Sequence, residues 1–254
     1  MSRRGFLSAA SLSVVGPLVG CALPTLTDPG VTGSARLTAR PGSPSTTGTK
    51  GLHPLGLFYQ SVVSDGVVYV PESYSVVSPA PLVLLLHGAR GTGAEFIVRR
   101  IPEADITGQI LLAPDARSGS WDWVYGAFGN DIGSIDAALH DTFSRYAIDA
   151  RRIAVAGFSD GATLSLGLGV ANGDLFTRVV GWSPGQLIGH ERIGKPPIYL
   201  SHGTQDAVLP IEYTSRKIVS ELRDAHYQVT LREFDGPHGV PDDVLREAME
   251  WMAA

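Results

Sequence analysis

The chain has 254 residues, of which 44% are hydrophobic and 18% are charged, a composition that suits one globular domain with a large buried core. Its formal net charge of -5 shows no excess of basic residues, so nucleic acid is excluded as an expected partner. The single cysteine excludes a disulfide within one chain.

Residues 1–20 are predicted to be an export signal. Arg3 and Arg4 precede a modest apolar stretch from Leu7 to Val19, which is the arrangement of a twin-arginine signal. Serines and Pro17 interrupt this stretch, and it is shorter than the roughly 20 apolar residues that a membrane-spanning helix needs. The signal therefore takes no part in the predicted fold.

The signal ends in Leu-Val-Gly-Cys at residues 18–21, which resembles the lipobox of bacterial lipoproteins. The resemblance implies that Cys21 is lipidated and becomes the mature N-terminus of an exported protein anchored to a membrane of the cell envelope. Several acyl chains on one residue would make that anchor stable. The alternative is an ordinary thiol in a signal peptide that is cut elsewhere, which would leave a secreted or periplasmic protein.

A flexible tether is predicted over residues 21–51. Between Pro24 and Lys50, 18 of 27 residues are Pro, Gly, Ser or Thr, and apolar residues show almost no periodicity. A flexible chain of this length reaches on the order of 30 Å from end to end. The folded domain is accordingly expected to begin near Leu52 and to run to Ala254.

Strands and helices are predicted to alternate from that point, which is the pattern of a mostly parallel sheet with helices on both faces. Residues 60–70, with Asp65-Gly66 in the middle, indicate a hairpin. Residues 81–86 and 109–113 are continuous apolar runs, typical of strands buried on both faces.

The next predicted helix begins at Asn130-Asp131, which can cap it, and a strand follows at residues 152–156. The helix would present one apolar face, made of Ile132, Ile135, Leu139 and Phe143.

The sequence GFSDG follows this strand and precedes a predicted helix that starts at Ala162. Strand, sharp turn and helix are the order that a nucleophile elbow requires, with Ser159 as the nucleophile. Glycines at 157 and 161 would let the strand and the helix approach closely around a strained serine. The alternative is that Ser159 only caps the helix.

A serine nucleophile needs a base that is held in place by an acid, and in α/β-hydrolases these follow the serine as Asp or Glu and then His. Strands are predicted at residues 179–182, 197–201 and 229–234. Asp206 lies in the loop after the second of these strands, and His238 lies in the loop after the third. They are the predicted acid and base.

Two other carboxylates, Glu233 and Asp235, lie close to His238 in the sequence and are alternative acids. Asp206 is favoured because both alternatives belong to the strand end that carries the histidine and would be badly aimed to orient it. His87 and His202 precede glycines at strand ends and are expected to form structural hydrogen bonds.

Backbone N–H groups are the expected donors to the oxyanion of a tetrahedral intermediate, and removing one such donor costs about 3 kcal/mol. One should be the N–H of Asp160, which follows the nucleophile. The other should come from the loop at residues 87–93, where Ala89 and Arg90 are the candidates.

Trp121 and Trp123 follow the strand that ends at Ala113, so they fall on the same edge of the sheet as Ser159 and are candidate walls of a substrate pocket. Trp182 also follows a strand end and is a further candidate. The alternative is simple packing under a loop. Only fourteen residues separate Trp182 from Pro197, too few for a large helical lid, so an open site is expected.

Five segments together resemble the α/β-hydrolase superfamily, most closely phospholipase/carboxylesterases and polyhydroxybutyrate depolymerase-like esterases. They are LLLHGARGTG, LLAPDARSGSWDW, IAVAGFSDGA, SHGTQDAVLP and FDGPHGVP. The resemblance implies an α/β-hydrolase fold without a large cap domain and a serine carboxylic-ester hydrolase that forms an acyl-enzyme. It also implies a catalytic triad of Ser159, Asp206 and His238 acting on small to medium acyl esters.

Other functions stay open. Depolymerase-like, peptidase or acyltransferase activity could use the same scaffold, although the absence of cysteines from the folded part departs from the depolymerase pattern. A non-catalytic, lipid-anchored binding module is a further alternative. No metal-binding cluster, phosphate loop or dinucleotide motif is visible in the sequence, so neither a metal nor a cofactor is expected.

Overall fold

The computed structural model describes residues 31–57 and 65–254, and within them it forms one eight-stranded sheet in the order β1-β2-β4-β3-β5-β6-β7-β8. The two pairings that involve β2 are antiparallel and the remaining pairings are parallel. The strands are β1 (Gly51–Pro54), β2 (Gly66–Val70), β3 (Ala80–Leu86), β4 (Ile110–Pro114), β5 (Ile148–Phe158), β6 (Arg178–Trp182), β7 (Ile198–Gly203) and β8 (Val229–Phe234).

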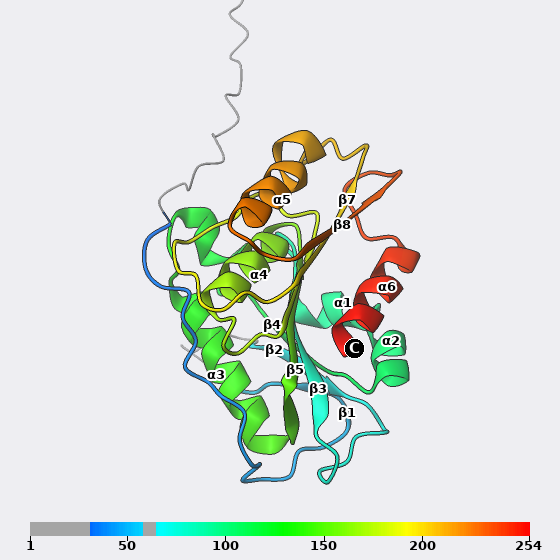
Figure 1. Cartoon of the computed structure of the whole chain (residues 1–254). Coiled ribbons are helices and arrows are strands. Elements are labelled where there is room, and N and C mark those ends of the chain that lie inside the picture. The colour runs from blue at the N-terminus through cyan, green and yellow to red at the C-terminus, as the bar shows by residue number, and fades with distance from the viewer. Residues whose placement is uncertain (1–30, 58–64) are drawn as a thin grey trace, which may run out of the picture.

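Helices cover both faces of this sheet (Figure 1). One layer holds α3 (Asn130–Arg145), α4 (Asp160–Ala171) and α5 (Ser215–Asp224), and the opposite layer holds α1 (Gly93–Val98), α2 (Ile101–Thr107) and α6 (Asp242–Ala253). The described residues between β6 and β7 contain no helix. The predicted fold, a mostly parallel sheet between two helical layers, is therefore confirmed.

The central strands are apolar without alternation because each face of the sheet is covered. All residues of β3 are buried, and its side chains divide between two cores. Leu82, Leu84 and Leu86 join the core under α3 and α4, whereas Val83 and Leu85 join the core under α1 and α6. Burial on both faces is what the continuous apolar runs predicted.

Helix α3 buries the predicted face, but its start differs from the prediction. Gly129 is the N-cap, and Asn130 and Asp131 lie in the first turn. The Asp131 carboxylate instead accepts hydrogen bonds from the N–H groups of Arg117 (2.7 Å) and Asp122 (2.6 Å). Asp131 thus holds the loop that precedes the helix rather than the end of the helix itself.

The predicted hairpin over residues 60–70 is also wrong, because a different segment pairs with its second arm. β2 pairs antiparallel with β1 on one side, with Gly51 opposite Val70 and Pro54 opposite Val67, and with β4 on the other. Gly66 is the first residue of β2 and adopts φ +109°. A Cβ there would also lie 2.3 Å from the carbonyl oxygen of Ala113, so only glycine fits this position. Its glycine serves close strand packing, not a turn. The predicted first arm, residues 60–64, lies outside the described part.

Residues 31–50, here called the N-terminal strap, pack against the domain, so the prediction of a flexible tether is wrong from residue 31 onward. The strap runs along the layer of α3 and α4 in Figure 1. It places four small or medium apolar side chains in the main core, each at most 5% exposed: Val31, Ala35, Leu37 and Ala39.

Polar side chains of the domain satisfy the backbone of the strap. The buried Asn172 side chain accepts from the N–H of Leu37 (2.8 Å) and donates to the carbonyl oxygen of Ala35 (2.8 Å). Arg36 and Arg40 both form ion pairs with Asp174. The hydrogen bond from Arg36 is the main reason that the pKa of Asp174 lies well below its usual range. A segment without repeating secondary structure is therefore held by specific contacts.

Replacing Leu37 with alanine is expected to lower the free energy of unfolding by about 2–4 kcal/mol, because it opens a cavity in a closed core. Leu52, which is 45% exposed, is the matched control, and Leu52→Ala should change stability by less than about 1 kcal/mol. Urea unfolding of both variants measures this difference. Equal, small effects would show that the strap contributes no stability.

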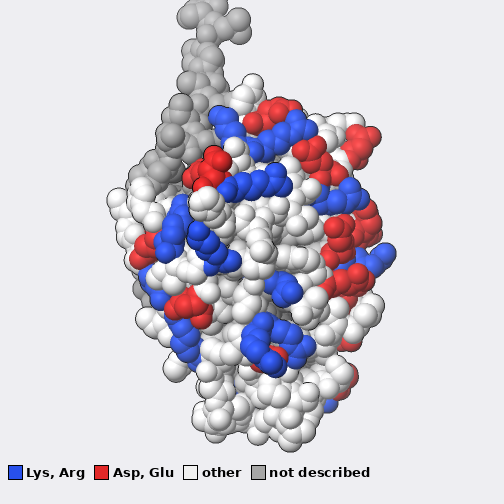
Figure 2. All heavy atoms as spheres, viewed as in Figure 1, with Lys and Arg blue, Asp and Glu red and all other residues white. Residues whose placement is uncertain are grey.

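Charged residues are mixed on the surface. On the face seen in Figure 2, Lys and Arg side chains lie among Asp and Glu side chains rather than in one continuous basic area. This arrangement matches the net charge of -5.

Candidate active site

Ser159 lies at a sharp turn between β5 and α4. Its backbone adopts φ 55° and ψ −117°, a strained conformation for a residue with a side chain. The two glycines of the turn allow this geometry because a Cβ on Gly157 would lie 2.1 Å from the carbonyl oxygen of Gly161. A Cβ on Gly161 would lie 2.1 Å from the carbonyl oxygen of Leu86 in β3. The turn has the local geometry of a nucleophile elbow.

The side chain of Ser159 makes no capping hydrogen bond to α4 in this structure, which removes the alternative that the serine serves as a helix cap. Ser159 is half-buried, and no described residue forms a hydrogen bond with its hydroxyl group. Its N–H donates to the carbonyl oxygen of Trp182 at 2.9 Å, so the backbone is fixed while the hydroxyl is free to take a new partner.

Asp206 and His238 meet at the same edge of the sheet, from the loops after β7 and β8. The Nδ1 atom of His238 lies 2.6 Å from Oδ2 of Asp206, whose side chain is fully buried. Because the carboxylate oxygen can only accept, Nδ1 carries the proton and Nε2 is left with a lone pair. That tautomer is the one a general base requires.

Neither alternative acid contacts His238. Glu233 forms an ion pair with Arg216 at 2.8 Å, and Asp235 accepts a hydrogen bond from Gln205 at 2.6 Å. The structure therefore brings Asp206 to the histidine and holds the two other carboxylates elsewhere.

The imidazole also contacts the elbow. The ring of Phe158, which directly precedes Ser159, lies 4.8 Å from the ring of His238, centroid to centroid. Strands β5, β7 and β8 are parallel, so their carboxyl ends bring the serine, acid and histidine loops to one edge of the sheet. Sequence reasoning missed the role of Phe158, which was only a variable position within GFSDG.

Of the three candidate oxyanion donors, only the N–H of Arg90 already has a hydrogen-bond partner among the described residues. The N–H of Arg90 donates to the carbonyl oxygen of Gly119 at 2.9 Å, so this group is already committed and its candidacy is corrected. No described residue accepts from the N–H groups of Ala89 or Asp160. Asp160 is the first residue of α4, where an N–H has no partner within its own helix.

The expected pocket role of Trp121 and Trp182 is wrong, because both indoles are fully buried in the core. Trp121 donates from Nε1 to the carbonyl oxygen of His87 at 2.8 Å and thereby holds the loop that contains Ala89. Trp182 packs against Phe96, with 6.4 Å between ring centroids. Their strand-end positions could not show which way the rings turn.

Trp123 remains a candidate at the site edge. It is half-buried, and its Nε1 donates to the carbonyl oxygen of Asp160 at 3.0 Å. The Ser120 hydroxyl donates to the Asp160 carboxylate at 2.6 Å. Two side chains of one loop therefore hold Asp160, whose N–H is a candidate oxyanion donor.

His87 and His202 form the structural hydrogen bonds expected of them. His87 faces the carbonyl oxygen of Gly88 through Nδ1 and accepts from the N–H of Ala116 through Nε2. His202 contacts Ser215 through Nδ1 and the carbonyl oxygen of Leu209 through Nε2, both at 2.7 Å. Burial lowers the pKa of both histidines, so the folded protein keeps them neutral.

Stability is therefore expected to fall as the pH drops from 7.5 to 6. The unfolded chain binds protons at histidine near pH 6.5, whereas the folded chain does not until a lower pH, so protons favour unfolding. Burial raises the pKa of Asp131 to about 6, which acts in the opposite sense, because below that pH the folded protein binds the proton more readily. The fall should flatten below about pH 6.

Urea unfolding at several pH values measures this dependence, and His202→Gln should remove about half of the fall between pH 7.5 and 6. An unchanged slope in this variant would contradict the assignment of a buried neutral imidazole.

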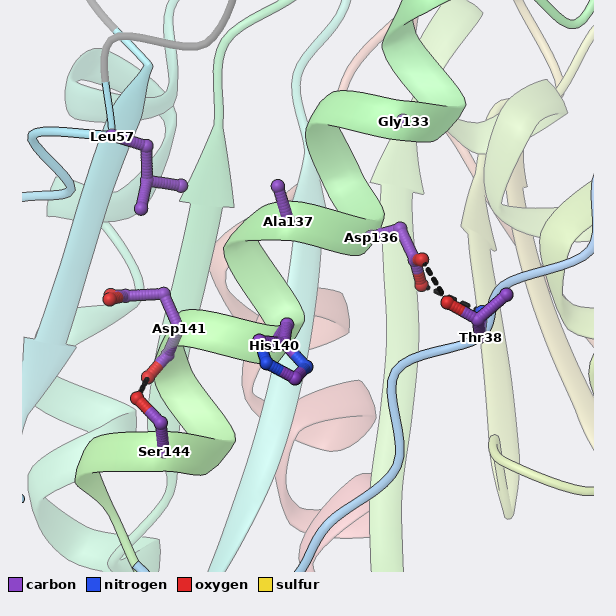
Figure 3. Close-up of a pocket in the computed structure, with 8 residues that line it drawn as sticks. All are labelled: Thr38, Leu57, Gly133, Asp136, Ala137, His140, Asp141 and Ser144. Carbon is purple, nitrogen blue, oxygen red and sulfur yellow. Dashed lines mark hydrogen bonds between the residues drawn. The ribbon is translucent and has the colours of Figure 1, made fainter. Parts of the chain in front are cut away.

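A separate hollow of about 640 Å³ lies against the outer surface of α3 (Figure 3). Thr38 of the strap and Leu57 border it, together with Gly133, Asp136, Ala137, His140, Asp141 and Ser144 of the helix. In Figure 3 Asp136 points toward Thr38 and forms hydrogen bonds with it. The hollow includes none of the candidate catalytic residues. Across residues 31–57 and 65–254, no three His, Cys, Asp or Glu side chains are grouped to bind a metal ion.

Comparison with known proteins gives the family. The model of the phospholipase/carboxylesterase family matches residues 127–254, half of the chain. A probable feruloyl esterase C of Aspergillus flavus is 30% identical over 155 residues, covering 58% of this chain and 56% of the relative. The chain thus spans little more than half the length of that relative.

Two solved structures show the same fold. Esterase PE8 is 24% identical with a TM-score of 0.60, covering 73% of this chain and 97% of its own. A Bacillus cereus carboxylesterase is 18% identical with a TM-score of 0.57, covering 77% of this chain and 97% of its own. With the matched half containing the elbow and the loops after β7 and β8, this chain belongs to the phospholipase/carboxylesterase family of α/β-hydrolases.

Proposed function

We propose that the protein is a serine carboxylic-ester hydrolase in which Ser159, His238 and Asp206 form the catalytic triad. The observation that carries the proposal is a strained serine at a strand-to-helix turn whose preceding residue, Phe158, packs against a histidine bound to a buried aspartate at 2.6 Å. Family membership supports ester hydrolysis as the reaction class.

In the proposed reaction, Nε2 of His238 takes the proton of Ser159 as the serine oxygen attacks the ester carbonyl carbon. The oxyanion of the tetrahedral intermediate accepts hydrogen bonds from the N–H groups of Ala89 and Asp160. The intermediate collapses when the C–O bond to the alcohol breaks, and the imidazolium returns its proton to the leaving oxygen. Water then attacks the acyl-serine by the same route and releases the acid.

The proposed substrates are esters of small to medium acyl groups. The segment between β6 and β7 carries no helix in the described structure, so it supplies no large lid over the serine. A second candidate class, supported by the name of the Aspergillus flavus relative, is feruloyl esters. Depolymerase-like, peptidase and acyltransferase reactions are not favoured by any described contact.

A substrate series separates these classes. Hydrolysis of p-nitrophenyl esters from acetate to palmitate is expected to fall with chain length, because a site without a lid gives long chains little to bind. Methyl ferulate in the same assay tests the second class. Turnover that rises toward palmitate would contradict the preference for short acyl groups, and hydrolysis of no ester would overturn the proposed reaction.

We also propose that the protein is exported and anchored through a lipid on Cys21, which lies with the signal outside the described residues. The only support is the sequence pattern at residues 18–21. None of the described helices is both long and apolar enough to cross a bilayer. Cys21→Ala should move the protein from the membrane fraction to the soluble fraction with its activity intact, and unchanged partitioning would exclude this anchor.

The position of the strap determines which side of the domain such an anchor would hold near the membrane. Thr32 pairs with Ala127, and its N–H donates to the carbonyl oxygen of Gly126 at 3.0 Å. Gly126 and Ala127 follow Trp123 in the chain, and Trp123 contacts Asp160 at the elbow. An anchor only ten residues before Val31 would hold this side of the domain close to the membrane surface.

A further inference from the structure

The carboxylate of Asp206 contacts two histidines, and only one of them belongs to the proposed triad. Its Oδ2 atom lies 2.6 Å from Nδ1 of His238 and 3.1 Å from Nε2 of His202. Its Oδ1 atom accepts from the N–H groups of Val208 (2.9 Å) and Leu209 (2.8 Å). Both side chains of the Asp206–His202 pair are fully buried.

The contacts of His202 determine which of its nitrogens carries the proton. Nε2 faces two oxygens that can only accept, the carbonyl oxygen of Leu209 at 2.7 Å and Oδ2 of Asp206. Nε2 must therefore be the protonated nitrogen, and Nδ1 accepts from the Ser215 hydroxyl at 2.7 Å. Every polar atom of the ring has a partner, so the imidazole cannot rotate without losing hydrogen bonds.

We propose that His202 is a positioning residue that orients the Asp206 carboxylate toward His238, an inference that rests on the proposed function of the triad. The N–H groups of Val208 and Leu209 hold Oδ1 of the carboxylate. The protonated Nε2 of His202, which is hydrogen-bonded to the carbonyl oxygen of Leu209, lies 3.1 Å from Oδ2, on which the remaining direction points to His238. The aspartate is thereby oriented before any substrate binds, which saves the cost of ordering it during the reaction.

A neutral donor suits this place. Burial lowers the pKa of His202, so the ring donates a hydrogen bond without carrying a positive charge. A charged His202 would repel the imidazolium that forms on His238 when it takes the serine proton. A lysine or arginine could donate to Asp206, but it would add that repulsion.

Two substitutions separate positioning from simple packing. In His202→Gln the side-chain amide nitrogen reaches the place of Nε2 and keeps the contact with Asp206. In His202→Asn the shorter amide reaches only the place of Nδ1, so it keeps Ser215 and loses Asp206. Both variants lose the ring, which makes their effects on stability comparable.

On p-nitrophenyl acetate, His202→Asn is expected to lower kcat by about 10- to 100-fold with KM within about twofold, because the contact of a polar N–H with the charged carboxylate at 3.1 Å is lost. His202→Gln should stay within about fivefold of the wild type. Equal kcat values in the two variants, or losses that only follow their melting temperatures, would overturn the inference.

A second readout does not depend on turnover. The His238 N–H proton bonded to Asp206 should give a low-field resonance in the proton NMR spectrum of the full chain, assigned by its loss in His238→Gln. It should persist in His202→Gln and broaden or vanish in His202→Asn; persistence in both would overturn positioning. If the wild type hydrolyses no ester, the proposed function fails while this spectrum still decides the role of His202.

Discussion

Replacing Ser159 with alanine is expected to lower kcat for ester hydrolysis by at least about 10,000-fold while leaving the melting temperature within about 2 °C of the wild type. The loss follows from removing the oxygen that is proposed to attack the ester. Stability is kept because the hydroxyl forms no hydrogen bond with any described residue and the strained backbone is unchanged. Steady-state kinetics with p-nitrophenyl acetate and thermal unfolding measure both effects.

Ser183 is a matched control for this experiment. It also adopts a left-handed backbone, with φ 52°, and it follows the neighbouring strand β6. Its hydroxyl is buried without a hydrogen-bond partner in the described structure. Ser183→Ala should therefore keep its activity, and activity that survived in Ser159→Ala would end the serine-nucleophile account.

Asp206→Asn is expected to lower kcat at neutral pH by about 10,000-fold with the fold retained. The N–H groups of Val208 and Leu209 both donate to Oδ1, so the asparagine carbonyl oxygen takes that place and its amide nitrogen turns toward His238. Nδ1 of His238 then accepts instead of donating, and Nε2 carries the proton. A histidine in this tautomer cannot take the proton of Ser159.

Asp235→Asn provides the control for the acid assignment. Asp235 is exposed and contacts Gln205 rather than His238, so its neutralisation should change kcat by less than about threefold. Measuring kcat of both variants on the same ester decides which of the two carboxylates is the acid. A large loss in Asp235→Asn with normal activity in Asp206→Asn would reverse the assignment.

The strands and the elbow could be predicted because they depend on local patterns that burial enforces. A run such as residues 81–86 has no polar alternation, and only a strand covered on both faces can bury it. GFSDG stands between such a strand and a helix, and the steric demands around Ser159 explain its glycines. The loops of Asp206 and His238 followed from the parallel strand order.

The strap could not be predicted from composition, because its stability comes from distant partners. Asn172 lies 135 positions after Leu37, and neither residue shows in isolation that they pair. The predicted hairpin over residues 60–70 failed for a related reason, since Asp65-Gly66 has a turn-like sequence but Gly66 is required by strand packing against Ala113. Local turn preferences gave way to tertiary contacts.

The tryptophans and His202 show the same limit at the site. The sequence shows that Trp121 and Trp182 follow strands of the sheet. It does not show whether each ring faces the site or the core, because that depends on the space between the packed layers. His202 was expected to form structural hydrogen bonds, and it does. Its contact with Asp206 depends on the fold of the loop between them, which no sequence pattern specified.

Acylation of Ser159 is the step on which the proposed reaction depends, and intact-protein mass spectrometry after mixing with a p-nitrophenyl ester tests it most directly. The protein should retain the strap, because a chain that begins near Leu52 would lack four buried core residues. One acyl group per chain is expected, located on the peptide that contains Ser159 and absent from Ser159→Ala. An acyl group on another residue, or one that persists in Ser159→Ala, would contradict it.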